Sequence, residues 1–368
     1  MKNDKRIYVD FHIIQTVPPS CVNRDDTGSP KTAIYGGVRR ARVSSQSWKR
    51  AMREMFREDL DEKELGIRTK KIVSLVTNEI LKIQPEIESE DAEQLAAKVV
   101  NCCGISTEKK KGDKEKTKAL FFISRTQAEN LAKYILENKD NEEKAIKKSV
   151  KQFLKTEHSI DIALFGRMVA DDPSLNADAS AQVAHSISTH RVENEYDYFT
   201  AIDDLAPEDN AGADMIGVVE YNSSTLYRYA TVAVHNLAKE LGDEKHATAE
   251  AVAAFAKAFI QSMPTGKQNT FANRTLPDAV LVTVRNDQPV NFVGAFEEPV
   301  WTSEGGYVKK SIEKMEAYAE NIYKNYLGTP QESWGIGLSE KVQKANLKEL
   351  LQNIKETVAK ELDASGQG

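Results

Sequence analysis

The chain has 368 residues, of which 40% are hydrophobic and 29% charged, and it carries a net charge of −6 at pH 7. This balance describes a globular protein with room for one large domain with insertions, or for two domains. No apolar run approaches the ~20 residues of a membrane helix, the N-terminus leads into a strand pattern instead of a signal peptide, and three cysteines with no C-x-x-C spacing exclude a disulfide framework and argue against zinc. We therefore expect a cytoplasmic protein that does not associate with a membrane.

The first predicted element is a β-strand over residues 6–17. Apolar side chains occupy every second position from Ile7 to Ile13, which predicts a half-buried strand that ends at Pro18-Pro19. His12 lies on the other face of this strand. We interpret it as an exposed or hydrogen-bonded residue and not as a catalyst.

A basic segment, residues 23–53, follows the strand. This basic island holds eight Lys or Arg and two acids, a local charge of +6 on an acidic chain. Polyanions are drawn to such a place and weakly repelled elsewhere. We expect a loop with Gly36-Gly37, where another chain can approach closely, and then a helix to about Phe56 with Ser44 or Ser45 as its N-cap.

The composition of the basic island favours contact with a phosphate backbone. Free N–H groups at a helix N-terminus suit a phosphate, and Lys49 and Arg53, four residues apart, lie along one helix face. Glycines, a serine-rich helix start and cations together predict a cradle for a nucleic-acid strand. The alternative is a solvated amphipathic helix with a basic loop. A Walker-type nucleotide loop is excluded because no G-x-x-x-x-G-K-[ST] pattern occurs.

Residues 59–160 are predicted to be mostly helical. Helical spacing occurs over Thr69–Ile83, Asp91–Val100 and Thr126–Leu136, whereas the low-complexity stretch Glu108–Lys118 is typical of a mobile loop.

A lysine stripe closes this region. Its members recur every three or four residues, opposite an apolar face that includes Ala145 and Val150. The stripe is either a solvated helix face or a contact that does not read sequence, most simply to a DNA backbone, because lysine acts as a point charge without planar readout. The lysines are Lys144, Lys147, Lys148, Lys151 and Lys155.

A long hairpin is predicted in the region that follows. Tyr196–Thr200 and Val218–Tyr229 have strand character and flank the Asp- and Gly-rich segment 203–217. We expect this hairpin to protrude. The alternative is an ordinary surface hairpin, which would leave its exposed apolar residues (Leu205, Met215 and Ile216) without a purpose.

Two other features of this region concern loops and histidines. Gly166-Arg167-Met168 follows an apolar run and is predicted to lie in a loop. His185 and His190 are five residues apart, so they do not share a helix face as metal ligands would, and we interpret both as structural.

The C-terminal part completes an α+β pattern. A helix is expected over Ala247–Ser262, a polar loop over Gly266–Thr270 and a buried strand over Ala279–Arg285. Helices are expected again at 308–327 and 338–362. Strand, helix and strand recur as in a β-α-β-β-α-β plan. Because the aromatic signature of a sheet-face RNA binder is absent, any RNA should lie across loops and a helix end.

Three dense groups of residues carry a family resemblance. The first group is Cys21–Asp26, Ala33–Gly37, Arg42–Ser47 and Lys49–Arg53; the second is Asp161–Met168 with Ala184-His185 and Thr189-His190; the third is Phe199–Leu205 with Ser223-Ser224 and Tyr227–Ala230. In order and spacing, over about residues 6–56 and 160–300, these groups resemble the CasC family, the backbone subunit of type I-E CRISPR Cascade complexes. Residues 60–155 and the last sixty match poorly.

The resemblance implies an α+β fold likened to a right hand. The palm is RRM-like (ferredoxin-like) and corresponds to residues 1–58, 160–195 and 226–368. A helical fingers insertion corresponds to 59–159, and a β-hairpin thumb to 196–229.

The resemblance also implies a function. Members of the family are non-catalytic and have no metal or other cofactor. Several copies polymerise along the CRISPR RNA spacer, and the thumb of one copy folds over the next and displaces a nucleotide at regular intervals. The nucleotides between are displayed for pairing with target DNA in antiviral defence. Other Cascade subunits complete the complex, and cleavage belongs to a recruited helicase-nuclease.

Carried over position by position, the resemblance predicts two sets of contact residues. The thumb tip departs from the family, so the residue that wedges the bases stays open. The guide RNA contacts are Arg24, Lys31, Ser44, Gln46, Lys49 and Arg53, with Met168 packing against a base. The contacts to incoming DNA duplex are Lys144, Lys147, Lys148 and Lys151.

Two other functions remain open from the residues. One is a metal-dependent, guide-processing ribonuclease and the other a general sequence-tolerant binder of single-stranded RNA. A nuclease needs several carboxylates around a divalent ion, but near the cradle there are only Asp10, Asp25 and Asp26. We expect the Asp25-Asp26 pair to orient Arg24 or to pair with a neighbouring copy.

Overall fold

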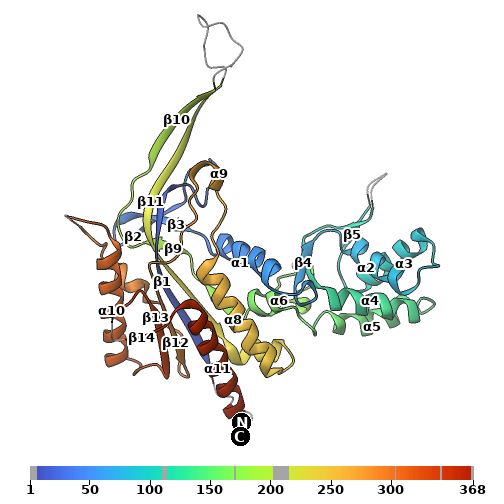
Figure 1. The fold of residues 1–368 in the computed structure, drawn as a ribbon. Coiled ribbons are helices and arrows are strands. Elements are labelled where there is room, and N and C mark those ends of the chain that lie inside the picture. Colours follow the sequence, from blue (N-terminus) through green and yellow to red (C-terminus); the bar gives the residue numbers. More distant parts are fainter. Residues whose placement is uncertain are drawn as a thin grey trace, which may run out of the picture.

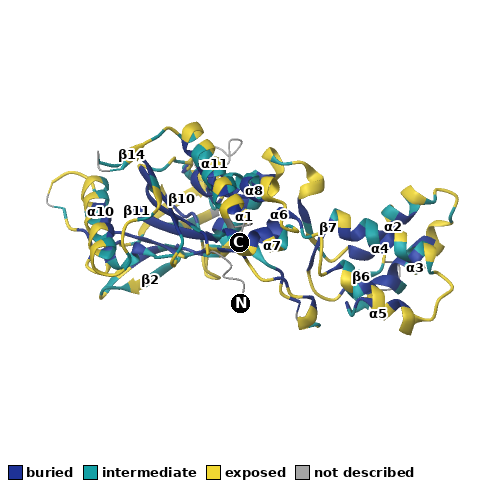
Figure 2. Ribbon diagram, turned by 90° about the horizontal axis from the view of Figure 1, so that it is seen from below, coloured by how far each residue is buried: buried dark blue, intermediate teal, exposed yellow. Residues whose placement is uncertain are grey.

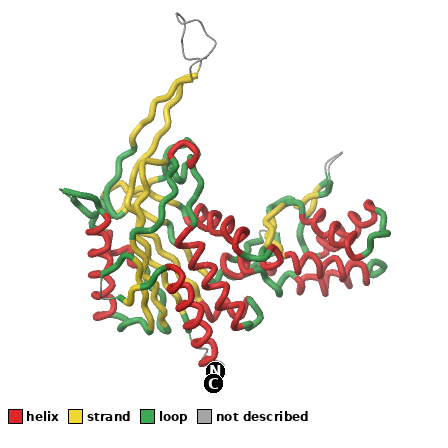
Figure 3. The backbone as a smooth tube through the Cα atoms, viewed as in Figure 1, coloured by secondary structure: helices red, strands yellow, loops and turns green. Residues whose placement is uncertain are grey.

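One wide, mixed sheet organises the protein (Figures 1 and 3). The computed structural model describes residues 6–109, 114–169, 171–201, 215–302, 304–339 and 342–365. The sheet has the strand order β14-β13-β12-β1-β11-β9-β3-β2, and β8 and β10 also pair with β11. Its strands are β1 (Tyr8–Ser20), β2 (Thr32–Tyr35), β3 (Val38–Val43), β8 (Ala181–Val183), β9 (Ser186–Ser188), β10 (Glu195–Ala201), β11 (Met215–Ala233), β12 (Ala279–Arg285), β13 (Glu332–Ile336) and β14 (Gln343–Lys344).

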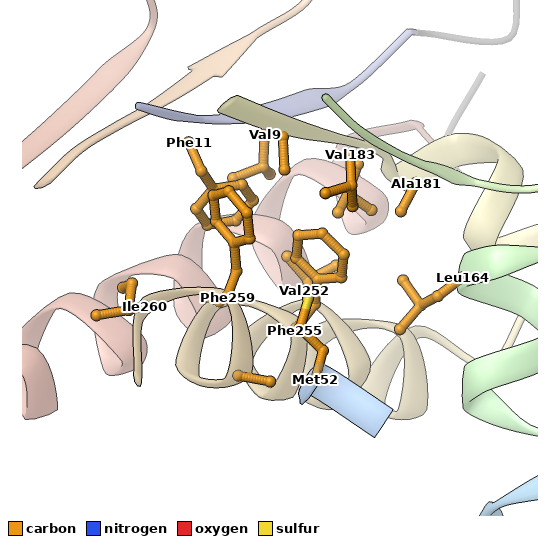
Figure 4. Close-up of a cluster of buried hydrophobic side chains, with 14 of the residues drawn as sticks. Val9, Phe11, Met52, Leu164, Ala181, Val183, Val252, Phe255, Phe259 and Ile260 are labelled. Atoms are coloured by element: carbon orange, nitrogen blue, oxygen red, sulfur yellow. The ribbon is translucent and has the colours of Figure 1, made fainter. Parts of the chain in front are cut away.

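Helices cover one face of the sheet with a large apolar core. Val9 and Phe11 of β1 point into this core, where Phe255 and Phe259 of α8 meet them (Figure 4). Phe11 lies 5.5 Å from Phe255, ring centre to ring centre. The helices on and around this core are α1 (Ser45–Asp59), α6 (Ile160–Phe165), α7 (Val234–Glu240), α8 (Lys245–Gln261) and α11 (Leu347–Ser365).

The opposite face of the sheet is covered as well. The 3-10 helix η4 (Phe292–Phe296) and α10 (Val308–Asn325) place Phe292, Phe296 and Met315 against Tyr227 and Tyr229 of β11. β1 is consequently buried from Val9 to Gln15 on both faces and continues through Pro18-Pro19, so the prediction of a half-buried strand was wrong. Neither face of the central strands is open to a ligand.

A buried polar network fastens η4 to the sheet. The Tyr229 hydroxyl donates to Asp10 Oδ1 (3.1 Å) and the Val290 N–H donates to Asp10 Oδ2 (2.9 Å). His12 Nδ1 lies 2.9 Å from the Tyr227 hydroxyl, and its ring stacks on Phe292 at 3.9 Å. Burial raises the pKa of Asp10 to about 6 and lowers the pKa of His12 to about 3. Burial disfavours the charged form of both groups, so His12 stays neutral at neutral pH and Asp10 becomes neutral below about pH 6.

Asp10→Asn should steepen the loss of stability in acid. The pKa of Asp10 rises on folding from 3.8, so its contribution to stability is complete below that pH and is lost as pH rises through 6. The pKa of His12 falls from 6.5, so its contribution is complete above that pH and is lost as pH falls towards 3. The two slopes oppose each other in wild type. The variant should therefore lose stability faster than wild type between about pH 6 and 4, as measured by urea unfolding; an unchanged slope would contradict this.

A helical lobe projects to the side of the sheet and has a core of its own (Figure 2). Val76, Val99, Leu131 and Ile146 are fully buried in it. Its elements are the 3-10 helix η1 (Glu62–Glu64), β4 (Gly66–Thr69), α2 (Ile72–Ile83), α3 (Ser89–Cys102), β5 (Thr107–Glu108), β6 (Lys116–Thr117), β7 (Phe121–Ser124), α4 (Arg125–Glu137) and α5 (Glu143–Phe153).

Most helix predictions for this lobe are confirmed within a few residues, with two corrections. The stretch 108–118 was expected to be a loop, but its described ends pair as β5 and β6; residues 110–113 lie outside the described part. Ala145 is exposed, and Ile146 takes the apolar face of α5. Periodicity alone shifts easily by one residue when alanine adjoins isoleucine.

The predicted long hairpin is present. β10 and the outer part of β11 form an antiparallel ribbon that extends away from the sheet (Figure 1). Leu205 lies outside the described residues. The described part of β10 is exposed along its whole length, which confirms the protrusion.

Two further predictions need correction. The loop expected before α1 is largely a hairpin, β2 and β3, which extends the sheet. The helix expected from residue 338 begins only at Leu347, because Gln343-Lys344 forms β14 beside β13. The remaining short elements are the 3-10 helix η2 (Pro173–Leu175) and α9 (Gln268–Phe271).

Candidate nucleic-acid interface

The basic island folds into the β2–β3 hairpin and the start of α1. Gly36 and Gly37 form its two-residue turn with φ of 58° and 75°, the left-handed values that such hairpin turns require. A Cβ on Gly36 would lie 1.6 Å from the Glu297 carbonyl oxygen, whereas one on Gly37 would meet open space. The turn is therefore docked through Gly36 and free at Gly37.

Arg40 belongs to the interior and cannot contact a ligand. Its side chain is fully buried and donates to the carbonyl oxygens of Ser188 (3.0 Å) and Phe296 (2.8 Å). Burial lowers its pKa. One of the eight cations of the basic island thus joins the hairpin to η4.

The start of α1 offers donors to an anion. Ser44 is the N-cap, as predicted, but its side chain makes no capping hydrogen bond. Its N–H donates to Asn23 Oδ1 (2.9 Å), and the first intrahelical bond runs from the Ser47 N–H to the Ser44 carbonyl. The N–H groups of Ser45 and Gln46 therefore have no intrahelical acceptor. Gln46 is exposed at this end, whereas the Ser44 side chain is buried.

Lys49 and Lys31 both lie near the start of α1, but their surroundings differ. Lys49 is half-buried, its ammonium lies 5.6 Å from the Phe165 ring centre, and burial lowers its pKa. Lys31 is partly exposed and its N–H donates to the Asn23 carbonyl (2.9 Å). Both side chains are compatible with a phosphate contact.

Arg53 is committed to the fold. Its side chain is 17% exposed, and Nε lies 3.0 Å from Oδ2 of Asp161, which is 3% exposed. Asp161 Oδ1 accepts from the Gly66 N–H (2.8 Å), and the Arg53 guanidinium covers the Phe122 ring at 4.3 Å. These partners connect α1 to the base of the helical lobe. An RNA contact by Arg53 would require this pair to break, so we leave it out of the proposed interface.

Met168 stands at the surface on a rigid support. It is 87% exposed, which is unusual for a large apolar side chain. The preceding residue, Arg167, is buried and donates to the carbonyl oxygens of Leu175 (3.0 Å) and Phe122 (3.1 Å). The loop is thereby fixed while Met168 points away from the core, as a residue that packs on a base would.

The long hairpin carries an apolar stripe on one face. Directly opposed residues of an antiparallel pair share a face, and the register pairs Tyr198 with Val218 and Thr200 with Ile216. Tyr196, Tyr198, Val218 and Ile216 are each more than half exposed. We call these four residues the hairpin stripe. A stripe of this kind on a projecting ribbon marks a contact surface.

The lysine stripe of α5 divides into free and engaged members. Lys144, Lys147 and Lys148 are exposed. Lys151 lies 2.5 Å from Asp172 Oδ2 and is 38% exposed, and it holds the pKa of Asp172 at about 2. The first three are thus free to meet a polyanion, and Lys151 is tied to the loop before η2.

Carboxylates and histidines in this region serve the fold. Asp25 Oδ1 accepts from the N–H groups of Thr27 (2.9 Å) and Ser29 (3.0 Å), so Asp25 shapes its own loop and does not orient Arg24 as expected. His190 is buried and stacks on Tyr307 at 3.6 Å, whereas His185 is exposed and approaches Arg42 at 3.1 Å. Within the described residues no three His, Cys, Asp or Glu side chains are grouped as metal ligands.

Two parts of the interface were not predicted from the sequence: the tyrosines of the hairpin stripe and Lys267. The hairpin stripe was recognisable from alternation, since Tyr196, Tyr198 and Thr200 are spaced by two. Lys267 was read as part of a polar loop, yet the fold brings it beside Arg24 and Arg50. Nothing local to residue 267 signals that proximity.

The fold matches chains of solved CRISPR surveillance complexes. A chain of a solved structure described as "CRISPR RNA-guided surveillance complex, pre-nicking" is 32% identical, with a TM-score of 0.82 over 95% of this chain and 100% of that one. Another, described as "CRISPR RNA-guided surveillance complex", is 27% identical, with a TM-score of 0.70 over 96% of this chain and 99% of that one.

The family assignment rests on sequence as well. The profile of the CT1975-like protein family matches residues 9–360, and the chain belongs to that family. No curated protein matches it. Among the described residues no helix is long and apolar enough to cross a bilayer.

Proposed function

We propose that this protein is a non-catalytic, RNA-binding backbone subunit of a type I-E Cascade complex, of the CasC class. The observation that carries the proposal is the match over almost the whole chain to a subunit of a CRISPR RNA-guided surveillance complex. The basic island and the projecting hairpin supply the physical means. Several copies would line up along one guide RNA in the cytoplasm, together with other Cascade subunits.

The palm of such a subunit corresponds to the central sheet. Along the chain, β1, α1, β9, β11, α8 and β12 follow a β-α-β-β-α-β plan, and their strands lie in the order β12-β1-β11-β9. This arrangement supports an RRM-like palm. Because helices cover both faces of the sheet, RNA would run past the β2–β3 hairpin and the start of α1.

The contacts we assign to RNA do not depend on its sequence. Cations and N–H groups bind phosphates, which carry no base identity. Any guide can therefore be loaded, and specificity passes to Watson–Crick pairing with target DNA. A guide held in order in advance loses less conformational entropy on pairing. The proposed RNA contacts are Arg24, Lys31, the N–H groups of Ser45 and Gln46, the Gln46 side chain, Lys49 and Met168.

The hairpin stripe would contact the guide RNA and the next copy of the protein along it. Each of its four side chains is more than half exposed. Unstacked bases of the guide RNA would bury these side chains together with the surface of the next copy of the protein. Phe199, on the other face, covers Gly217 closely enough that a Cβ there would lie 2.3 Å from its ring, which stiffens the ribbon.

Lys49→Ala should weaken binding of guide RNA equally for all sequences. The lost contact is to a phosphate, so log K should also fall less steeply with log salt, by about one unit of slope. Fluorescence anisotropy with two unrelated spacer RNAs measures both quantities. Lys309→Ala removes the same charge from an exposed position on α10 and serves as the control. A loss of affinity for one RNA only would contradict the proposal.

Lys144, Lys147 and Lys148, changed together to alanine, should impair binding of target DNA by the guide-loaded complex and leave guide RNA binding intact. Their free ammonium groups favour a backbone contact. Lys151→Ala is the matched variant, because Lys151 already has Asp172 as its partner. It should change DNA affinity little. Equal losses from both variants would argue against a DNA contact by the free lysines.

The ribonuclease alternative predicts that the purified protein cleaves spacer RNA, whereas the scaffold proposal predicts that it does not. Spacer RNA incubated with the protein should stay intact with and without Mg²⁺, and a separate helicase-nuclease would cut the target. Cleavage that Asp25→Ala abolishes would remove the scaffold proposal. A general single-strand binder would take up RNA but would not co-purify with guides when a CRISPR array is expressed beside it.

A further inference from the structure

A polar cavity of about 580 Å³ lies on the side of α1 that faces away from Lys49. Three segments form its wall. They are the loop at residues 22–28, the α1 face that carries Ser47 and Arg50, and the loop at 264–267. These segments are separate in the sequence, and the fold brings them together.

The two loops of the cavity are locked together by close backbone contact. A Cβ on Gly266 would lie 2.1 Å from the Val22 carbonyl oxygen and 2.7 Å from that of Cys21. The Asn273 amide donates to the Gly266 carbonyl (3.4 Å). Only glycine permits this approach, so the distance between the loops is set by the backbone and does not need a ligand.

The charges in the cavity leave cations available. Asp25 is occupied by its own loop, and Glu54 accepts from Arg50 at 3.0 Å. Arg24 and Lys267 show no side-chain hydrogen bond or ion pair to the described residues. Both nevertheless lower the pKa of the Cys21 thiol, against the larger effect of its burial. Three cations and three carboxylates line the cavity, so its formal charge is balanced. Arg24 and Lys267 are the cations left for a phosphate, and Asp26 is the carboxylate without a side-chain partner among the described residues.

The backbone at Lys267 is itself unusual. Lys267 has a φ of 51°, and Ala272 a few residues on has a φ of 46°. Left-handed conformations of residues other than glycine are unfavourable and persist where the surrounding structure holds them. Lys267 lines the cavity in this conformation.

We propose that this cavity is a second phosphate site, in which Arg24 and Lys267 together bind one phosphate of the guide RNA. Arg24 already belongs to the RNA contacts proposed above, whereas Lys267 and its loop are additional parts of the interface. The site would extend the path of the RNA from the Lys49 side of α1, over its free N–H groups, to the opposite side. The inference rests on the proposed function, because the phosphate belongs to the guide strand.

Lys267→Asn tests the site with the full-length protein and a labelled single-stranded spacer RNA. Asparagine tolerates a left-handed conformation, so this change removes the charge with little strain. RNA affinity should fall about tenfold, and the salt slope should drop by about 0.7. Lys267→Arg should retain binding. Arg24→Ala combined with Lys267→Asn should lose less than the sum of the two single changes, because both residues bind one phosphate.

The outcomes separate the inference from the function. If the wild-type protein fails to bind RNA, the proposed function is wrong. If the wild type binds and Lys267→Asn binds with the same affinity and slope, the second phosphate site is wrong and the proposed function stands. A loss no larger than that of Lys309→Ala, or a defect only in assembly between copies, would likewise overturn the site. Thermal unfolding of each variant shows that it is folded.

Discussion

Asp161→Ala should lower the free energy of unfolding by about 3 kcal/mol. Asp161 is almost fully buried and accepts hydrogen bonds from Arg53 Nε, the Gly66 N–H and the Ser159 hydroxyl. Removing the carboxylate leaves the Arg53 guanidinium confined against Phe122 without its counter-charge. A buried charge left without its partner destabilises a protein more than the removal of both members of the ion pair. Urea unfolding followed by circular dichroism measures the change.

Comparing Asp161→Ala with Arg53→Ala tests whether Arg53 stabilises the fold or binds RNA. If Arg53 joins α1 to the helical lobe, as its contacts indicate, then each single change should destabilise the protein and the double change should add little to either. The salt slope of RNA binding should stay at the wild-type value in all three variants. A reduced slope in Arg53→Ala with a normal slope in Asp161→Ala would instead show that Arg53 binds RNA.

Gly36→Ala should destabilise the protein by about 4 kcal/mol. The added methyl group would lie 1.6 Å from the Glu297 carbonyl oxygen, which is far inside van der Waals contact. The hairpin would have to move off η4. That movement would take Arg40 away from the carbonyl oxygens of Phe296 and Glu297, and a buried guanidinium would lose acceptors.

Gly37→Ala is the matched control at the neighbouring position. Its φ of 75° is also positive, but a Cβ there has no atom within 4 Å. Only the backbone preference is then disturbed, which amounts to about 1 kcal/mol. Equal losses from the two variants, measured by urea unfolding, would mean that the turn conformation matters and the docking onto Glu297 does not.

The identity of many elements follows from local sequence. The 3.6-residue spacing of α2, α4 and α10, the alternation of β10 and the apolar run of β12 are properties of neighbouring residues and were predictable. So was the hairpin turn at Gly36-Gly37, a two-glycine pair between residues of strand character, although we expected a loop there. β1 illustrates the limit. Its alternation resembles that of a half-buried strand, and only the packing of η4 and α10 buries its second face.

A basic segment near the N-terminus, with a charge opposite to that of the whole chain, is visible in the amino-acid sequence alone. Which of its cations can contact a ligand depends on the folded protein. Arg24, Arg40 and Arg53 are the same residue type, but Arg40 is enclosed by Ser188 and Phe296, and Arg53 is paired with Asp161. The partners that withdraw a charge from solvent are more than a hundred residues away along the chain. Charge is a property of each residue, whereas availability depends on neighbours that only folding brings together.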